Sequence, residues 1–187
     1  MKRSLLALAV VASSTLVACG GGGGGSTNTA QFPQNTDMWQ GLGGDTKAPA
    51  AVSKVVNDAV TGLLADPKTA PYFANIGKPG HDSADRLTAC LNLQFNALFG
   101  GPYSYPGQVV ADGRLQTCDD MATAHADVGI PGCVFDQFIG DLAGALTANG
   151  VPQAYINRAA PVLVGLKGQV VSATPMYLGP NTAQNCQ

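Results

Sequence analysis

Histidine is the side chain best suited to bind a metal or move a proton near neutral pH, and this sequence has two, His81 and His125. His125 lies in the stretch MATAHADVGI, with the apolar residues Met121 one helical turn before it and Val128 just after it. Taken alone, it is explained most simply as a polar residue on a helix. A metal ligand is the alternative.

Five cysteines carry the other reactive groups of the chain. Cys19 ends an apolar N-terminal segment, and the remaining four are Cys90, Cys118, Cys133 and Cys186. An even number of cysteines in an exported chain is typical of disulfides, and four cysteines allow three pairings. The sequence has no CxxC and no paired Cys/His spacing, so it does not predict a zinc site.

The first nineteen residues, MKRSLLALAVVASSTLVAC, have the layout of a secretory signal. Lys2 and Arg3 precede an apolar run that is short for a membrane span, and small residues lead to the cysteine. The ending LVAC resembles the bacterial lipobox, in which the cysteine receives lipid and becomes the first mature residue. The resemblance implies a signal peptide over 1–18 and lipidation of Cys19.

Residues 19–36 form a segment rich in Gly, Ser, Thr and Asn, which is typical of a flexible tether. Gly20 stands where, by the same resemblance, some lipoproteins carry an Asp that retains them in the inner membrane. We therefore expect a cell-envelope protein, lipid-anchored to a membrane and facing the periplasm, with the outer membrane favoured. A net charge of −2 with scattered Lys and Arg argues against a nucleic-acid partner.

Helical periodicity dominates residues 37–173, and no alternating strand pattern stands out. Asp82 and Ser83 are cap signals, and Pro161 is expected to kink the last helix or to lie in its first turns. The sequence thus predicts one small all-α domain over 37–173 with a C-terminal tail over 174–187. The predicted helices span 48–65, 82–98, 121–129, 131–148 and 152 to about 171, and a long loop spans 102–118.

Four motifs occur in an order and at a spacing that resemble the group 1 truncated haemoglobins, over nearly the whole domain. They are LGG at 42–44, LLADPKTAPYF at 63–73, ALFGGPYSYPG at 97–107 and MATAHADVGIPGCVFDQFIGDLAGALTANGVP at 121–152. The resemblance implies a two-over-two helical sandwich around one haem. It also implies that His125 is the axial ligand of the haem iron, a role that suits a neutral imidazole.

The same resemblance assigns a set of cofactor-binding residues around His125. Phe73 falls where the family packs an aromatic ring on the haem, and Val60, Leu87 and Leu91 fall on the side where a gas would bind. Other candidates for the pocket wall, each equally well explained by core packing, are Tyr72, Phe95, Tyr105 and Phe138.

The gas-binding side departs from the family, in which many members carry Tyr and Gln there. Val and Leu cannot donate a hydrogen bond, so we expect faster oxygen release than from the tyrosine-containing relatives, unless Gln94 partly compensates. His81 is either a solvated loop residue or a sixth ligand of the iron. Arg86 is a candidate partner of a haem propionate on charge grounds.

The antiparallel helix arrangement implied by the resemblance favours the disulfides Cys90–Cys118 and Cys133–Cys186. A bridge from Cys118 to Cys90 would tie the long loop to the helix over 82–98, near the haem. The competing interpretation of Cys90 is a distal thiolate ligand, which an oxidising compartment disfavours.

Three functions remain open at this stage. The first is a haem protein that reversibly binds O₂, NO or CO in the envelope, with no catalytic residue and no identified electron donor. The second is a haem enzyme for NO dioxygenation or peroxidase-like chemistry, and the third is a haem-free globin-fold interaction module. Peroxidase chemistry needs a polar acid or base facing the iron, which Val60, Leu87 and Leu91 do not offer.

Overall fold

The computed structural model describes residues 36–180 and residue 186. The expected signal peptide over 1–18, the lipidation site Cys19 and the tether up to residue 35 lie outside the described residues. Within the described part of the chain, no helix is both long enough and apolar enough to cross a membrane.

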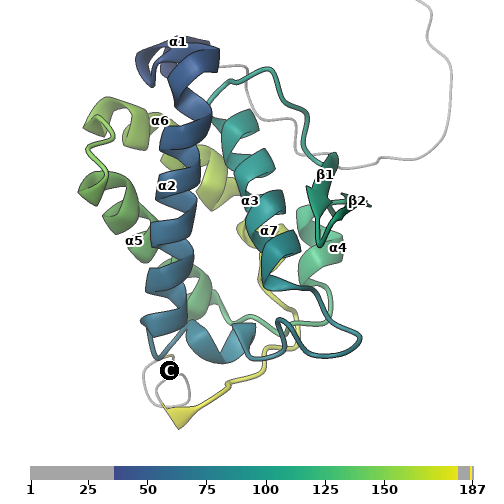
Figure 1. Cartoon of the computed structure of the whole chain (residues 1–187). Helices are drawn as coiled ribbons and strands as arrows, with labels where there is room; N and C mark the ends of the chain where they lie inside the picture. Colours follow the sequence, from purple (N-terminus) through teal and green to yellow (C-terminus); the bar gives the residue numbers. More distant parts are fainter. Residues whose placement is uncertain (1–35, 181–185, 187) are drawn as a thin grey trace, which may run out of the picture.

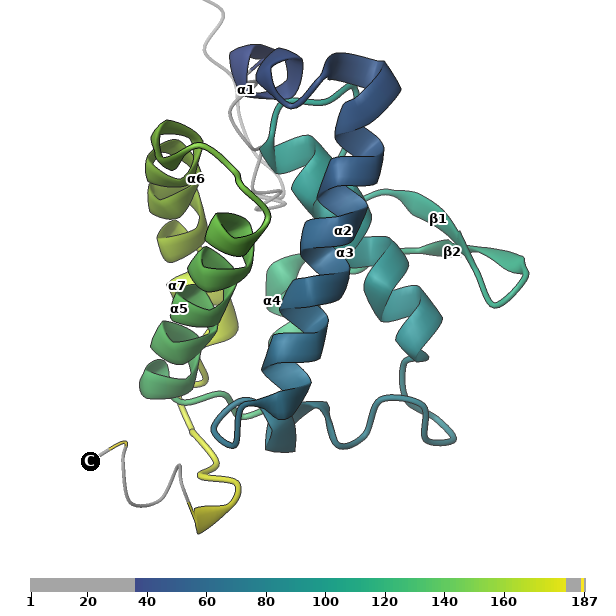
Figure 2. The ribbon, with the colours of Figure 1, turned by 60° about the vertical axis from the view of Figure 1, so that its left-hand side comes forward.

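The described residues form a mostly helical domain, as the sequence predicts, with one small β-hairpin (Figure 1). Helix α2 packs on both α3 and α5, and α5 packs on α6, so that the four long helices lie in two pairs (Figure 2). The elements in chain order are α1 (Thr36–Gly41), α2 (Gly44–Ala65), η1 (Ala70–Phe73), α3 (Ala84–Leu98), β1 (Gln108–Ala111), β2 (Arg114–Thr117), α4 (Met121–His125), α5 (Gly132–Ala148), α6 (Gln153–Gly165) and α7 (Lys167–Val170).

The two central helices end where the sequence predicts, at Ala65 and Leu98, but α2 begins at Gly44, four residues before the predicted start and without a side-chain cap. In α2, apolar residues recur on one face at helical spacing and are buried, among them Val52, Val56 and Leu63. The helix ends at Ala65, because the backbone of the next residue, Asp66, is extended. In α3, the side chain of Ser83 accepts a hydrogen bond from the backbone N–H of Arg86, which satisfies one of the free donors of the first turn.

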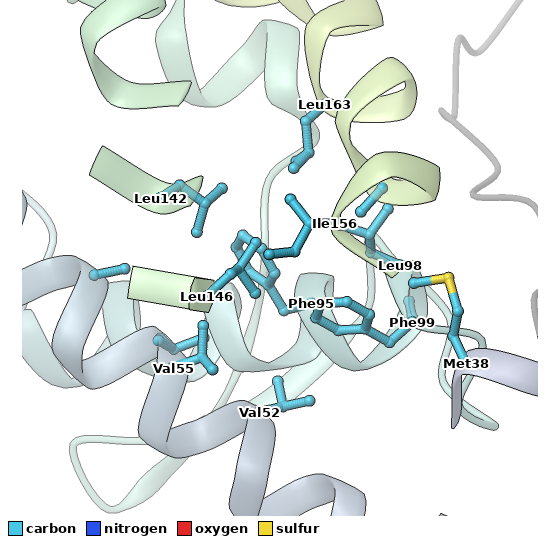
Figure 3. Packing of buried hydrophobic residues seen from close by; sticks show 14 of the residues in the cluster. Met38, Val52, Val55, Phe95, Leu98, Phe99, Leu142, Leu146, Ile156 and Leu163 are labelled. Carbon is cyan, nitrogen blue, oxygen red and sulfur yellow. The ribbon is translucent and has the colours of Figure 1, made fainter. Parts of the chain in front are cut away.

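The hydrophobic core lies where these helices meet (Figure 3). Val52 and Val55 from α2, Phe95 and Leu98 from α3, and Leu146 from α5 point toward one another there. All of them are almost fully removed from solvent, and side chains of α6 complete the cluster from the far side.

The prediction of a loop over 102–118 was wrong for residues 108–117, which form an antiparallel hairpin with Val110 opposite Leu115. Asp112 and Gly113 make its two-residue turn, and both have positive φ values, 52° and 71°. This backbone is the one in which an Asp-Gly turn matches the twist of paired strands. The hairpin extends from the body of the domain beside α3 (Figures 1 and 2).

The last predicted helix is divided in the structure. Pro161 lies inside α6 without ending it, and the chain leaves the helix at Gly165 and begins the short α7 at Lys167. Two short helices, α1 and η1, were not predicted; η1 carries Phe73.

Two disulfides join parts of the chain that are far apart in sequence. They are Cys90–Cys118, with Cα atoms 5.6 Å apart, and Cys133–Cys186, with Cα atoms 5.5 Å apart. This is the pairing that the family resemblance favours. The first joins α3 to the residues just before α4, and the second joins the start of α5 to residue 186.

Residues 172–178, here called the C-terminal strap, run back across the end of the domain that holds η1. The backbone N–H of Ser172 donates to Ile130 O at 2.9 Å, and that of Met176 donates to Gly129 O at 2.8 Å. The Tyr72 hydroxyl donates to Met176 O at 2.6 Å. The strap therefore holds the loop that follows α4 and connects it to η1.

Candidate functional site

A cavity of about 220 Å³ lies at the edge of the core and is lined by residues of α3, α4 and α5, together with residues of η1 and α7. Protein interiors have few voids larger than a water molecule, so a cavity of this size indicates a ligand site. Its walls are mainly aliphatic and aromatic, and the predicted residues among them are Phe73, Leu87, Leu91, Phe95, Tyr105 and His125, together with Tyr72, Arg86, Cys90, Gln94 and Phe138.

Val60 and His81 are not among the described residues that line this cavity. Val60 is partly buried against the core, whereas Leu63, three positions later, lies on the buried face of α2 and lines the cavity. An alignment by motif gives a position along a helix, and the packing of the helix decides which residues face inward. His81 is exposed in the loop before α3.

Several cavity residues were not predicted because they belong to later elements whose inner face depends on packing. Val134 and Phe135 come from α5, and Leu163, Leu166 and Val170 come from the segment that α6 and α7 share. The sequence predicts the helix over 131–148, but nothing in its pattern distinguishes a core residue from a cavity residue.

His125 is the last residue of α4 and faces the cavity. Its Nδ1 lies 2.7 Å from the carbonyl oxygen of Met121. Because a carbonyl oxygen only accepts hydrogen bonds, the contact assigns the ring proton to Nδ1 and leaves the Nε2 lone pair free. Burial lowers the pKa of His125, against the smaller opposing effect of the Met121 contact. The ring is therefore held neutral, as a metal ligand requires.

The helix that carries His125 is short, and its start is fixed by Asp120. The Asp120 carboxylate accepts a hydrogen bond from the Thr123 N–H at 2.9 Å, and this contact lowers the Asp120 pKa. A five-residue helix has little stability of its own, so α4 depends on such contacts and on its neighbours.

One rim of the cavity is polar. The Arg86 guanidinium pairs with Asp82 and lies 2.8 Å from the Asp119 carboxylate, and the Asp119 hydrogen bond raises the Arg86 pKa. The Tyr105 hydroxyl donates to Asp119 O at 2.8 Å, and burial, together with Asp120 and Asp119, raises the Tyr105 pKa to about 12. Arg86, expected beside a haem propionate, is thus paired with two carboxylates of this chain.

The α3 wall of the cavity is apolar at Leu87 and Leu91. Gln94, one turn further on, is buried, but its amide is directed elsewhere: Nε2 donates to the Met121 sulfur at 3.2 Å. Gln94 was expected to supply a hydrogen-bond donor on the gas-binding side in place of the family's Tyr and Gln. Its contact with Met121 does not support that role.

The donor set of the cavity fits haem. One neutral imidazole with a free Nε2 faces a cavity walled by aliphatic and aromatic side chains, which would suit a large, planar, mainly apolar group whose metal one histidine holds. In the described part of the chain, no three His, Cys, Asp or Glu side chains gather in a way that could hold a bare metal ion.

Comparisons with known proteins agree with this interpretation. No family model matches the chain. A group 1 truncated hemoglobin from Tetrahymena pyriformis is 29% identical over 126 residues, which are 67% of this chain and 87% of that protein.

Two solved structures show the same arrangement of helices. The crystal structure of truncated hemoglobin from Tetrahymena pyriformis in its Fe(III) form is 26% identical, with a TM-score of 0.57, and the match covers 72% of this chain and 97% of that one. THB4 from Chlamydomonas reinhardtii is 25% identical, with a TM-score of 0.50, over 72% of this chain and 94% of that one. The chain is therefore homologous to a group 1 truncated haemoglobin and has the truncated globin fold.

Proposed function

We propose that this protein holds haem in the cavity through His125 and reversibly binds a diatomic gas, O₂, NO or CO. Homology to a truncated haemoglobin implies globin-type haem binding. The observation that carries the proposal for this chain is the His125 ring, neutral, oriented by Met121 O and facing an apolar cavity.

Haem supplies the iron at which a small gas is held, and the residues of this chain determine its surroundings. His125 would hold the haem iron through its Nε2. Phe73, Leu87 and Leu91 keep water away and offer no hydrogen-bond donor to the gas. Such a wall favours CO and NO over dioxygen, which gains most from a donor because it carries more charge when bound.

An enzymatic use of the same site is the alternative. Neither Leu87 nor Leu91 can act as an acid or a base, so these two residues do not favour peroxidase chemistry. NO dioxygenation is tested by adding NO and O₂ to the haem-loaded protein together with a reductant that returns the iron to the ferrous state, and measuring nitrate. Many nitrates per haem would favour the enzyme, whereas one nitrate per haem is a single reaction that leaves ferric iron.

The test of haem binding is the absorbance spectrum of the protein reconstituted with haem. We expect a Soret band in the wild type, its loss or a large shift in His125→Ala, and recovery when imidazole is added to His125→Gly. His81→Ala is the matched control, because it removes the other histidine from an exposed loop, and its spectrum should equal that of the wild type. A Soret band that is unchanged in His125→Ala would overturn the proposal.

We further propose that Cys19 carries a lipid that anchors the protein to an envelope membrane, on the strength of the LVAC motif. Incorporation of a labelled fatty acid into the wild type, and its loss in Cys19→Ser, is the expected result. Equal labelling of the two would contradict lipidation at this residue.

A further inference from the structure

Three cavity-lining residues of α3, Arg86, Cys90 and Gln94, are spaced four apart and so lie on one stripe of the helix. Each is bonded to the segment 117–121, which leads directly into α4. We call this line of contacts the seam. It joins the helix on one side of the cavity to the helix that carries His125 on the other.

The first two contacts of the seam are ionic and covalent. The Arg86 guanidinium donates to Thr117 O at 2.7 Å and to the Asp119 carboxylate at 2.8 Å. Between these two residues, Cys118 is 2% exposed and forms the disulfide with Cys90. The chain just before α4 therefore cannot move away from α3 without breaking a covalent bond.

The third contact of the seam, between Gln94 and Met121, is linked to His125 through the backbone of Met121. Gln94, 4% exposed, donates from Nε2 to the Met121 sulfur, and Met121 is 9% exposed. The carbonyl oxygen of the same Met121 accepts a hydrogen bond from the His125 Nδ1–H. One residue thus receives a contact from α3 on its side chain and orients the imidazole with its backbone.

We propose that the seam positions His125, so that Gln94, Met121 and the Cys90–Cys118 disulfide set the strength of the bond between the imidazole and the haem iron. This inference rests on the proposed haem binding. A five-residue helix cannot fix the direction of its last side chain alone, and hydrogen-bond partners of metal-bound histidines tune both ring orientation and ligand basicity. Gln94 and Met121 are positioning residues, because they act through His125.

The first test measures the iron–histidine stretching frequency by resonance Raman spectroscopy of the ferrous, gas-free, haem-loaded protein. Gln94→Leu and Met121→Leu should each shift the frequency, and the double variant should show no more than the larger single shift, because both changes break one contact. Gln137→Leu is the matched control. It removes an amide of α5 that bonds to Asp66 and Asp141, away from the cavity lining, and it should leave the frequency unchanged.

The second test measures how fast haem is lost to an excess of a haem-scavenging apoglobin. Replacing Cys90 and Cys118 together by Ser should speed the loss about tenfold, the lower end of what outer partners of a metal-bound histidine contribute. The control replaces Cys133 and Cys186 by Ser. Their separation is 53 residues against 28, so the control should lose at least as much stability in the chain-entropy account. Equal acceleration in both variants would mean general destabilisation and would overturn the proposal.

The outcomes separate this inference from the haem proposal. A wild type without a His125-dependent Soret band contradicts haem binding. A wild type with that band, but with the same stretching frequency in Gln94→Leu and Met121→Leu, contradicts the positioning role alone. If the disulfide variant fails to fold, the Gln94 and Met121 variants still decide, since each replaces one buried side chain by another of similar size.

Discussion

At the scale of single residues, the chemistry of the site depends on which nitrogen of His125 carries the proton. The Nδ1–H group donates a hydrogen bond to Met121 O, and burial disfavours a second proton on the ring. Nε2 can therefore bind a metal without the ring first losing a proton. A charged histidine would have to lose one, and metal binding would then weaken as the pH falls.

The apolar wall at Leu87 gives a prediction about gas release. Leu87→Gln adds a donor on the α3 wall, and we expect O₂ release to slow about tenfold, which corresponds to about 1.4 kcal/mol and lies in the usual range for a buried hydrogen bond. Stopped-flow measurement of O₂ dissociation checks this. Leu87→Met, of similar size but without a donor, should release O₂ at nearly the wild-type rate, and equal slowing in both variants would argue against a hydrogen-bond effect.

Tyr105 gives a prediction about pH. Its pKa is raised from 10.0 to about 12, chiefly by burial, so its contribution to stability is complete below pH 10 and is lost as the pH rises toward 12. We expect the difference in unfolding free energy between the wild type and Tyr105→Phe to shrink over this interval, as measured by denaturant titration. If the difference in unfolding free energy stays constant from pH 9 to about pH 12, the raised pKa of Tyr105 does not contribute to stability.

The site residues that sequence reasoning located are those held by strong local signals. His125 follows a capped helix, and Leu87 and Leu91 lie on the inner face of a clearly amphipathic one. Val60 does not line the cavity, because it lies beside the buried face of α2 and is partly buried against the core, whereas Leu63 on that face reaches the cavity. The seam could not be predicted from the sequence, because the contact between Gln94 and Met121 joins two different helices and depends on how they pack.

At the scale of elements, the hairpin depends on two residues with left-handed backbone. Gly113→Ala should lower the unfolding free energy by about 1–2 kcal/mol, since Gly113 has a φ of 71° and a β-carbon there meets no other atom, which leaves backbone strain as the cost. Gly140→Ala is the matched control in the exposed face of α5. It also has open space but lies in a helix, and it should raise the unfolding free energy by about 0.5–1 kcal/mol. Chemical denaturation measures both, and effects of the same sign would contradict the argument.

The hairpin itself was missed although its Asp-Gly turn is a known signal. Each strand has four residues, too few for alternation to stand out, and β1 places Val109 and Val110 side by side. The end of α6 had a signal as well, Gly165, but the apolar residues around it continue the helical spacing. Short elements of this kind are fixed by contacts with the rest of the domain, here the disulfide and the Asp85 carboxylate that accepts from the Asp112 N–H.

At the scale of the whole molecule, the C-terminal strap connects three parts of the domain. A chain that ends at Val171 and carries Cys133→Ser loses the strap and its disulfide, and we expect a fall of about 2–5 kcal/mol in unfolding free energy. It should also show faster hydrogen exchange over 126–131. The full-length Cys133→Ser/Cys186→Ser variant keeps the strap hydrogen bonds. Its unfolding free energy should lie between those of the wild type and the truncated chain. If the two variants lose equal stability, those hydrogen bonds contribute nothing.

The two disulfides also divide the chain into closed rings, with a consequence for proteolysis. A single cut between Cys90 and Cys118, or between Cys133 and Cys186, leaves both pieces covalently joined. Between Cys90 and Cys186, only residues 119–132 lie outside both rings, so a single cut there separates the chain into two polypeptides. That segment carries α4 and His125, and it is also where the seam ends and the strap crosses. Residues 119–132, which neither ring encloses, are held instead by hydrogen bonds from α3 and from the strap.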